Sequence, residues 1–205
     1  MTKRVLVNKH ISIKTKIHSV LHLLNSSMFL MIFLVAVLSI PMLYIKNEYA
    51  HLKSYFYMMS FFVISSVIFF ICYWYMFKKS YGGGLKSFFK YTGTFFTFFS
   101  IAMGFSLHNS IAVLEGHFGK KSDFIRTPKF NIKTLQDSWR KNKYITKKPS
   151  INILAEGVLT LYFAFGMYSA FKVGDTGGDF GLFPFHLMLF FGFGYVFYTS
   201  IFTKS

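Results

Sequence analysis

Cysteine and acidic residues are scarce in this chain of 205 residues. The single cysteine, Cys72, lies within an apolar run, so it can form no internal disulfide and is most simply a small packing residue. Seven Asp and Glu residues stand against 23 Lys and Arg residues, which gives a formal net charge of +16. Charge alone would permit nucleic-acid binding, but no recognition fold accompanies it, so we expect no nucleic-acid partner.

Apolar residues are abundant. They make up 53% of the chain, 29 of them are Phe, and the mean hydropathy is +0.43. A soluble domain of this length could not bury so much apolar surface, so the composition predicts an all-α, multi-pass membrane protein. The first 26 residues are mixed and basic without a long apolar centre, and we expect no cleavable signal peptide there.

Five apolar stretches are each near the ~20 residues that a helix needs to cross ~30 Å of hydrocarbon. They are residues 27–45, 55–77, 93–114, 153–171 and 182–202. The pieces around them carry 5, 2, 4, 10, 1 and 1 Lys and Arg residues in chain order. If all five crossed, the loop with 10 basic residues would lie opposite the basic N-terminus, against the positive-inside tendency.

One stretch is therefore predicted not to cross. Residues 93–114 lie between the two basic pieces and carry small or polar residues at helical spacing, from Thr97 to Glu115. We interpret this stretch as an amphipathic interface helix, with a fifth span whose small face packs on a neighbour as the alternative. Both termini and the basic loop 115–152 would then be cytoplasmic.

The expected organisation is a single membrane domain. Residues 1–26 form an N-terminal interface helix, because apolar residues from Ile13 to Leu24 recur at helical spacing beside Lys14, His18 and His22. Four transmembrane helices follow, two within 27–77 and two within 153–202. His18 and His22, four residues apart, lack a third ligand nearby, so a polar helix face is favoured over a metal site.

The polar loop contains the hexapeptide Phe124-Ile125-Arg126-Thr127-Pro128-Lys129. Arg126 offers a planar fork of donors, Thr127 a hydroxyl and Lys129 a compact ammonium, a set that suits a phosphate-rich ligand. Pro128 disfavours helix at the preceding residue. Phe124 could anchor the loop at a membrane face. The alternative is a basic juxtamembrane loop that touches lipid headgroups.

The hexapeptide resembles the F-x-V-T-x-K gating loop of processive family 2 glycosyltransferases, the cellulose-synthase-like membrane enzymes, with Arg126 in place of Val. Further segments resemble that family in the same order. They are residues 14–27, which look like its interface helix, and Met103–Ser110, Glu115-Gly116, Gly119–Lys121 and Phe130-Asn131, which look like the approach to the loop and its continuation. The resemblance covers nearly the whole chain from about Lys14.

The resemblance implies the acceptor-binding, translocation and gating-loop portion of such an enzyme. It also implies a nucleotide-sugar donor, with a UDP-sugar expected, and a glycan or lipid acceptor. Family members also have a catalytic domain with D-x-D, T-E-D-type and Q-x-x-R-W motifs. None of these is in this sequence, and residues 136–140 have similar letters in the wrong order. We therefore expect no activity from this chain alone, a catalytic domain encoded upstream, and Mg or Mn bound by that domain rather than here.

Several other polar residues have two interpretations. His108 with Asn109 could line an acceptor path or form a buried polar cap, and Trp74 could stack on sugar rings or mark the membrane interface. Glu156 is the one carboxylate within an expected span, and pairing with Lys147 or Lys148 is favoured over a proton relay. His51, His117 and His186 show no pairing typical of haem ligation.

Two other functional classes remain open. One is a non-enzymatic basic membrane protein that binds anionic lipids. The other is a small transporter or channel, which is less favoured because the spans lack inverted repeats and paired charges. The resemblance also predicts a bacterial inner-membrane location. The sugar, the acceptor and the product class are not specified by the sequence.

Overall fold

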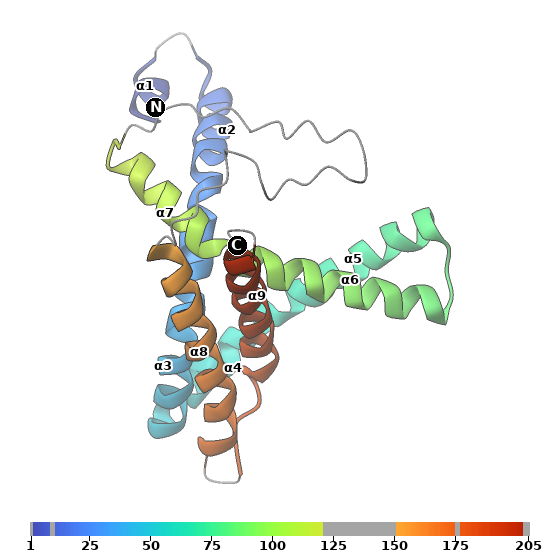
Figure 1. The fold of residues 1–205 in the computed structure, drawn as a ribbon. Coiled ribbons are helices and arrows are strands. Elements are labelled where there is room, and N and C mark those ends of the chain that lie inside the picture. Colours follow the sequence, from blue (N-terminus) through green and yellow to red (C-terminus); the bar gives the residue numbers. More distant parts are fainter. Residues whose placement is uncertain (1, 9–10, 121–150, 175–176, 203–205) are drawn as a thin grey trace.

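The computed structural model describes residues 2–8, 11–120, 151–174 and 177–202, and all regular structure in these ranges is helical (Figure 1). The α-helices are α1 Thr2–Val7, α2 Ile13–Leu24, α3 Met28–Glu48, α4 Lys53–Met59, α5 Val63–Tyr81, α6 Leu85–Gly104, α7 Ser106–His117, α8 Ile151–Lys172 and α9 Phe183–Phe202. Short 3-10 turns at Asn25–Ser27, Ala50–Leu52 and Ser60–Phe62 join α2 to α3, α3 to α4 and α4 to α5.

The described helices confirm an all-α integral membrane protein. Five helical segments are long and apolar enough to cross a bilayer. These segments are Ile13–Glu48, Ala50–Tyr81, Leu85–His117, Ile151–Lys172 and Phe183–Phe202. Many of their large apolar side chains point outward, as expected where lipid rather than water surrounds the helices.

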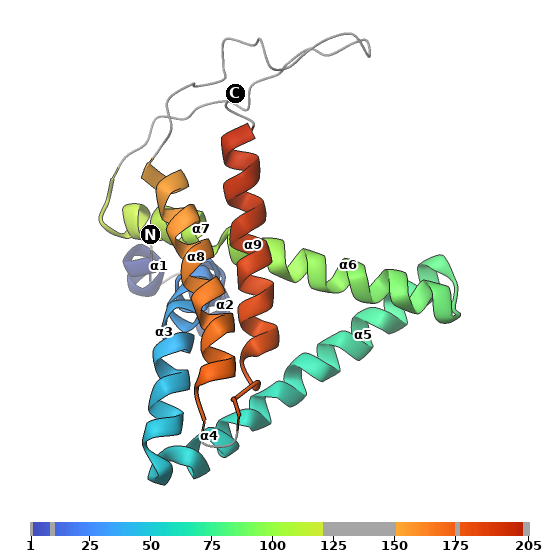
Figure 2. The same cartoon turned by 60° about the horizontal axis from the view of Figure 1, so that its bottom comes forward.

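The core lies between α3, α8 and α9, which stand side by side in both views, with α7 packed across one end (Figures 1 and 2). Six buried apolar residues from four helices form its centre: Ala36, Ile40, Leu107, Phe163, Leu189 and Phe193. The rings of Phe163 and Phe193 lie 5.3 Å apart and join α8 to α9. The remaining long helices, α5 and α6, form a hairpin that extends away from this bundle.

The expected helix at 93–114 has different bounds in the structure. Helix begins earlier, at Leu85, because the chain reverses through Gly82–Gly84, where Gly84 has a φ of 120° that L-residues rarely adopt. It then bends at Phe105, which separates α6 from α7. The polar stripe therefore faces two different helices. Gly104 of α6 packs against α9, while His108 of α7 contacts α8.

The crossing of α6 and α9 brings two backbones into direct contact. A Cβ at Gly192 would lie 1.9 Å from the carbonyl oxygen of Ser100, and a Cβ at Gly104 would lie 2.3 Å from the carbonyl oxygen of Gly192. No larger side chain fits between the two helices at this point. Small residues allow such close helix approach in membranes, and here they anchor the hairpin to the bundle.

A proline inside α3 is compensated by a side chain from α8. Pro41 has no N–H, so the carbonyl of Val37, four residues earlier, loses its helical donor. The hydroxyl of Tyr162 donates a hydrogen bond to that carbonyl at 2.7 Å. Because hydrocarbon offers no water as a substitute, this bond satisfies a group that would otherwise be costly within the membrane.

The N-terminal segment contains two helices rather than one continuous element. α1 is followed, within the described residues, by α2, whose N-terminus is capped by Ser12 accepting a hydrogen bond from the Thr15 amide at 3.2 Å. α2 then runs through the turn at Asn25–Ser27 into α3. Its apolar residues Ile13, Ile17 and Leu21 are exposed, which suits the predicted interface position.

Candidate functional site

The hexapeptide 124–129 lies outside the described residues, but the elements on either side of its segment are described. α7 ends at His117, and Gly119 with a φ of 74° turns the chain before Lys120, which forms an ion pair with Glu115. α8 begins at Ile151. α7 packs against the N-terminal part of α3, and one polar contact joins α7 to the second turn of α8.

That contact is the hydrogen bond between His108 Nε2 and Glu156 Oε1. Glu156 is fully buried, and its Oε2 has no hydrogen-bond partner among the described residues. His108 is partly exposed, with 36% of its side chain accessible. The bond requires one proton between the two groups, carried by either the imidazole or the carboxyl. A buried carboxyl beside a partly accessible imidazole therefore lies at the bundle end next to α7.

Pairing of Glu156 with Lys147 or Lys148, which was expected from the sequence, stays a prediction. Those two lysines lie outside the described residues, whereas His108 approaches the carboxyl from α7. His108 is a hydrogen-bonded polar group of α7, but it is partly exposed rather than buried. A role in an acceptor path stays a prediction.

A second buried polar contact joins α3 to α9. Ser39 Oγ lies 2.9 Å from His186 Nε2 and 2.6 Å from the Ala36 carbonyl oxygen, to which its hydroxyl donates. Since the hydroxyl has only one proton, Nε2 of His186 must carry its own and donate to Ser39. The sequence reasoning missed this pair. Its signal was a histidine and a serine inside apolar spans, where polar side chains seek partners.

The other predicted path residues are not gathered at one place. Asn109 is half-buried on α7 next to His108. Trp74 lies instead in the α5–α6 hairpin, where its ring packs edge-on against Phe88 at 5.1 Å and near Tyr91 at 5.4 Å. Trp74 therefore belongs to an aromatic cluster of the α5–α6 hairpin, and this hairpin extends away from α7, the helix that carries His108 (Figure 1).

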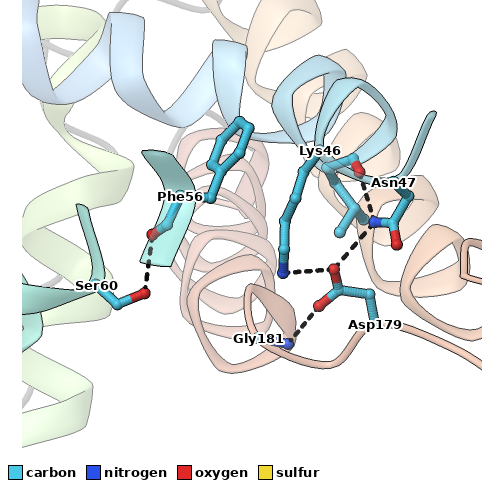
Figure 3. A network of polar contacts seen from close by, with 7 residues as sticks. Lys46, Asn47, Phe56, Ser60, Asp179 and Gly181 are labelled. Carbon is cyan, nitrogen blue, oxygen red and sulfur yellow. Dashed lines mark hydrogen bonds and ion pairs between the residues drawn. The ribbon is translucent and has the colours of Figure 1, made fainter. Parts of the chain in front are cut away.

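The opposite end of the bundle is closed by a network around Asp179 (Figure 3). Its Oδ2 accepts hydrogen bonds from Lys46 Nζ at 2.7 Å and from Asn47 Nδ2 at 3.0 Å, while Oδ1 accepts from the Gly181 amide at 3.2 Å. Burial acts to raise the pKa of Asp179, but these hydrogen bonds and the Lys46 charge outweigh it and lower the pKa. Asp179 thus ties α3 to the α8–α9 connection.

This network predicts acid-sensitive stability. A carboxyl whose pKa is lowered in the folded state stabilises that state above its ordinary pKa of about 4, and the contribution is lost as pH falls through the lower, folded-state value. We expect the melting temperature of the parent protein to exceed that of Asp179→Asn at pH 6. The gap should close as the pH falls below about 4. Circular dichroism melts in detergent across this pH range measure the gap, and a gap that is independent of pH would contradict the assignment.

Metal-binding groups are absent from the residues that the structure describes: no three His, Cys, Asp or Glu side chains come together there. His18 and His22 lie on exposed positions of α2.

No family model, curated protein or solved structure matches the chain. The function therefore has to be argued from the residues themselves.

Proposed function

We propose that this chain is the acceptor-binding, translocation and gating-loop portion of a family 2 glycosyltransferase that uses a nucleotide-sugar such as a UDP-sugar. The observation that carries the proposal is the order of the resembling segments, from residues 14–27 through Met103–Ser110 to the hexapeptide 124–129. Sugar transfer then requires a catalytic domain supplied by another chain or segment, which would also bind Mg or Mn.

The proposed topology has four transmembrane helices, with residues 93–114 at the cytoplasmic interface. Two features support it. α7 packs against the N-terminal part of α3 and reaches the second turn of α8 through His108, so these three helix regions share one end of the bundle. The basic pieces 1–26 and 115–152 adjoin that same end, which agrees with the positive-inside tendency for a bacterial inner membrane.

The division of roles follows from charge. The leaving diphosphate gains negative charge during sugar transfer, and cationic donors on a closing loop stabilise it. Arg126, Thr127 and Lys129 provide these donors, with Phe124 as the anchor at the membrane face. His108 and Asn109 would offer hydrogen-bonding groups to acceptor hydroxyls at the same bundle end.

The proposal predicts that sugar transfer depends more on Arg126 and Lys129 of the hexapeptide than on other cations of the same segment. When the protein in nanodiscs is combined with a family 2 catalytic domain as a separate chain, radiolabelled sugar transfer should appear. Arg126→Ala or Lys129→Ala should each lower it about tenfold, the effect of losing a charge-assisted hydrogen bond to phosphate. Lys133→Ala, which removes a cation of the same segment outside the hexapeptide, should leave it within about twofold.

Equal rates in all three variants would exclude the loop role. The competing function, a non-enzymatic protein that binds anionic lipid, predicts no transfer at all and no response to a UDP-sugar titration. In that case lipid binding would weaken with salt, because exposed charges are screened. The nucleotide titration therefore separates the two functions.

A further inference from the structure

The turn of the α5–α6 hairpin concentrates positive charge. Lys78 and Lys79 lie in the last turn of α5, Lys86 and Lys90 lie near the start of α6, and all four are exposed; we call them the lysine tip. The sequence between Glu48 and Glu115 contains no Asp or Glu. The hairpin therefore has no carboxylate of its own to neutralise these charges.

An aromatic layer lies directly beneath the lysine tip. Trp74, Phe77, Phe88 and Tyr91 pack on one another, and Tyr91 is only 4% exposed, with its hydroxyl donating to the Phe70 carbonyl at 2.5 Å. The ammonium of Lys90 lies 5.9 Å from the centre of the Tyr81 ring. The two helices are thus held together by packed rings just below the charges.

The order along the hairpin matches the layers of a bilayer. None of the 19 residues of α5 is buried, and most of its apolar side chains outside the aromatic layer are exposed, so hydrocarbon must cover them. Tryptophan and tyrosine favour the level of the headgroups, and exposed lysines beyond them reach the charged surface. Both views show the hairpin extending away from the bundle, which leaves the lysine tip accessible to lipid (Figures 1 and 2).

We propose that the lysine tip binds the headgroups of anionic phospholipids. The complementarity rests on four exposed cations without a local carboxylate, on the packed aromatic layer next to them and on the exposed apolar surface of α5 beyond it. The proposal is independent of the glycosyltransferase assignment, because it uses none of the residues of the loop 115–152.

Trp74 provides a direct probe of this binding. The chain has two tryptophans, so Trp139→Phe leaves Trp74 as the only one. In vesicles of phosphatidylcholine, brominated phosphatidylglycerol should quench Trp74 fluorescence more strongly than brominated phosphatidylcholine at the same fraction. The binding constant for phosphatidylglycerol should exceed that for phosphatidylcholine by about fivefold or more, which is the effect expected of one lysine near an anionic surface.

The control variants distinguish binding at the lysine tip from attraction by the protein's overall positive charge. Changing all four tip lysines to Gln should bring the relative binding constant to about one, whereas the matching Arg variant should keep the preference. Lys53→Gln with Lys172→Gln, which removes exposed charges elsewhere, should also keep it. Equal quenching by the two lipids in the parent protein would overturn the proposal, and so would weak quenching by both, which would mean that a second copy of the chain covers the hairpin.

Discussion

Gly192→Ala is expected to separate α6 from α9 and to destabilise the protein by at least about 2 kcal/mol, because overpacking of a tight contact costs 1–3 kcal/mol or more. The new Cβ would lie 1.9 Å from the Ser100 carbonyl oxygen, which is a backbone atom and cannot swing aside. In detergent, the melting temperature followed by circular dichroism should fall by roughly 5 °C or more.

Gly194 supplies the matched control on the same helix. A Cβ there would lie 3.5 Å from the Thr160 methyl carbon, an ordinary van der Waals distance. Alanine also favours helix over glycine by about 0.5–1 kcal/mol, so Gly194→Ala should leave stability unchanged or raise it slightly. If the two variants melted alike, the close crossing of α6 and α9 would be wrong.

His108→Leu is the second change with a large expected effect. It removes the hydrogen-bond partner of a carboxyl that is fully buried and whose other oxygen has no partner among the described residues. Breaking such a buried pair typically costs about 3–5 kcal/mol, since the remaining polar group stays in apolar surroundings. Chemical unfolding of the reconstituted protein measures the loss.

A double-mutant cycle identifies the source of that loss. Glu156→Gln keeps an acceptor and the side-chain shape, so it should cost about 1 kcal/mol or less. His108→Leu combined with Glu156→Leu should recover much of the stability, because both polar partners are then removed together. Simple addition of the two single Leu variants would show that His108 and Glu156 do not interact.

The long apolar runs made the helical membrane architecture predictable from the sequence. The Gly82–Gly84 break was also visible there, because three consecutive glycines interrupt the apolar pattern. The start of α6 at Leu85 was missed, since Lys86 and Lys90 make its first turns look like a loop. Composition therefore predicts well that a helix lies in a membrane, but it predicts poorly at which residues the helix begins and ends.

The partners of the buried polar groups were beyond the sequence patterns. Glu156 was recognised as a carboxylate within a span, but its contact with His108, 48 residues away, was not expected. Ser39 and His186 are separated by 147 residues. Likewise, nothing in the sequence distinguishes Gly192 from Gly194, because only the crossing of two helices makes one of them irreplaceable. The hexapeptide itself lies outside the described residues, so its predicted role stays a prediction.

The hydroxyl of Tyr162 has a consequence for how the protein assembles. The Val37 carbonyl, which accepts its hydrogen bond, is synthesised 125 residues before Tyr162. Until α8 enters the bilayer, the first half of the chain therefore holds an acceptor that only water, lipid headgroups or a transient neighbour can satisfy. Biogenesis of α3 is completed by a helix made much later, so a ribosome-bound chain that stops before α8 should be held less firmly in the membrane than the finished protein.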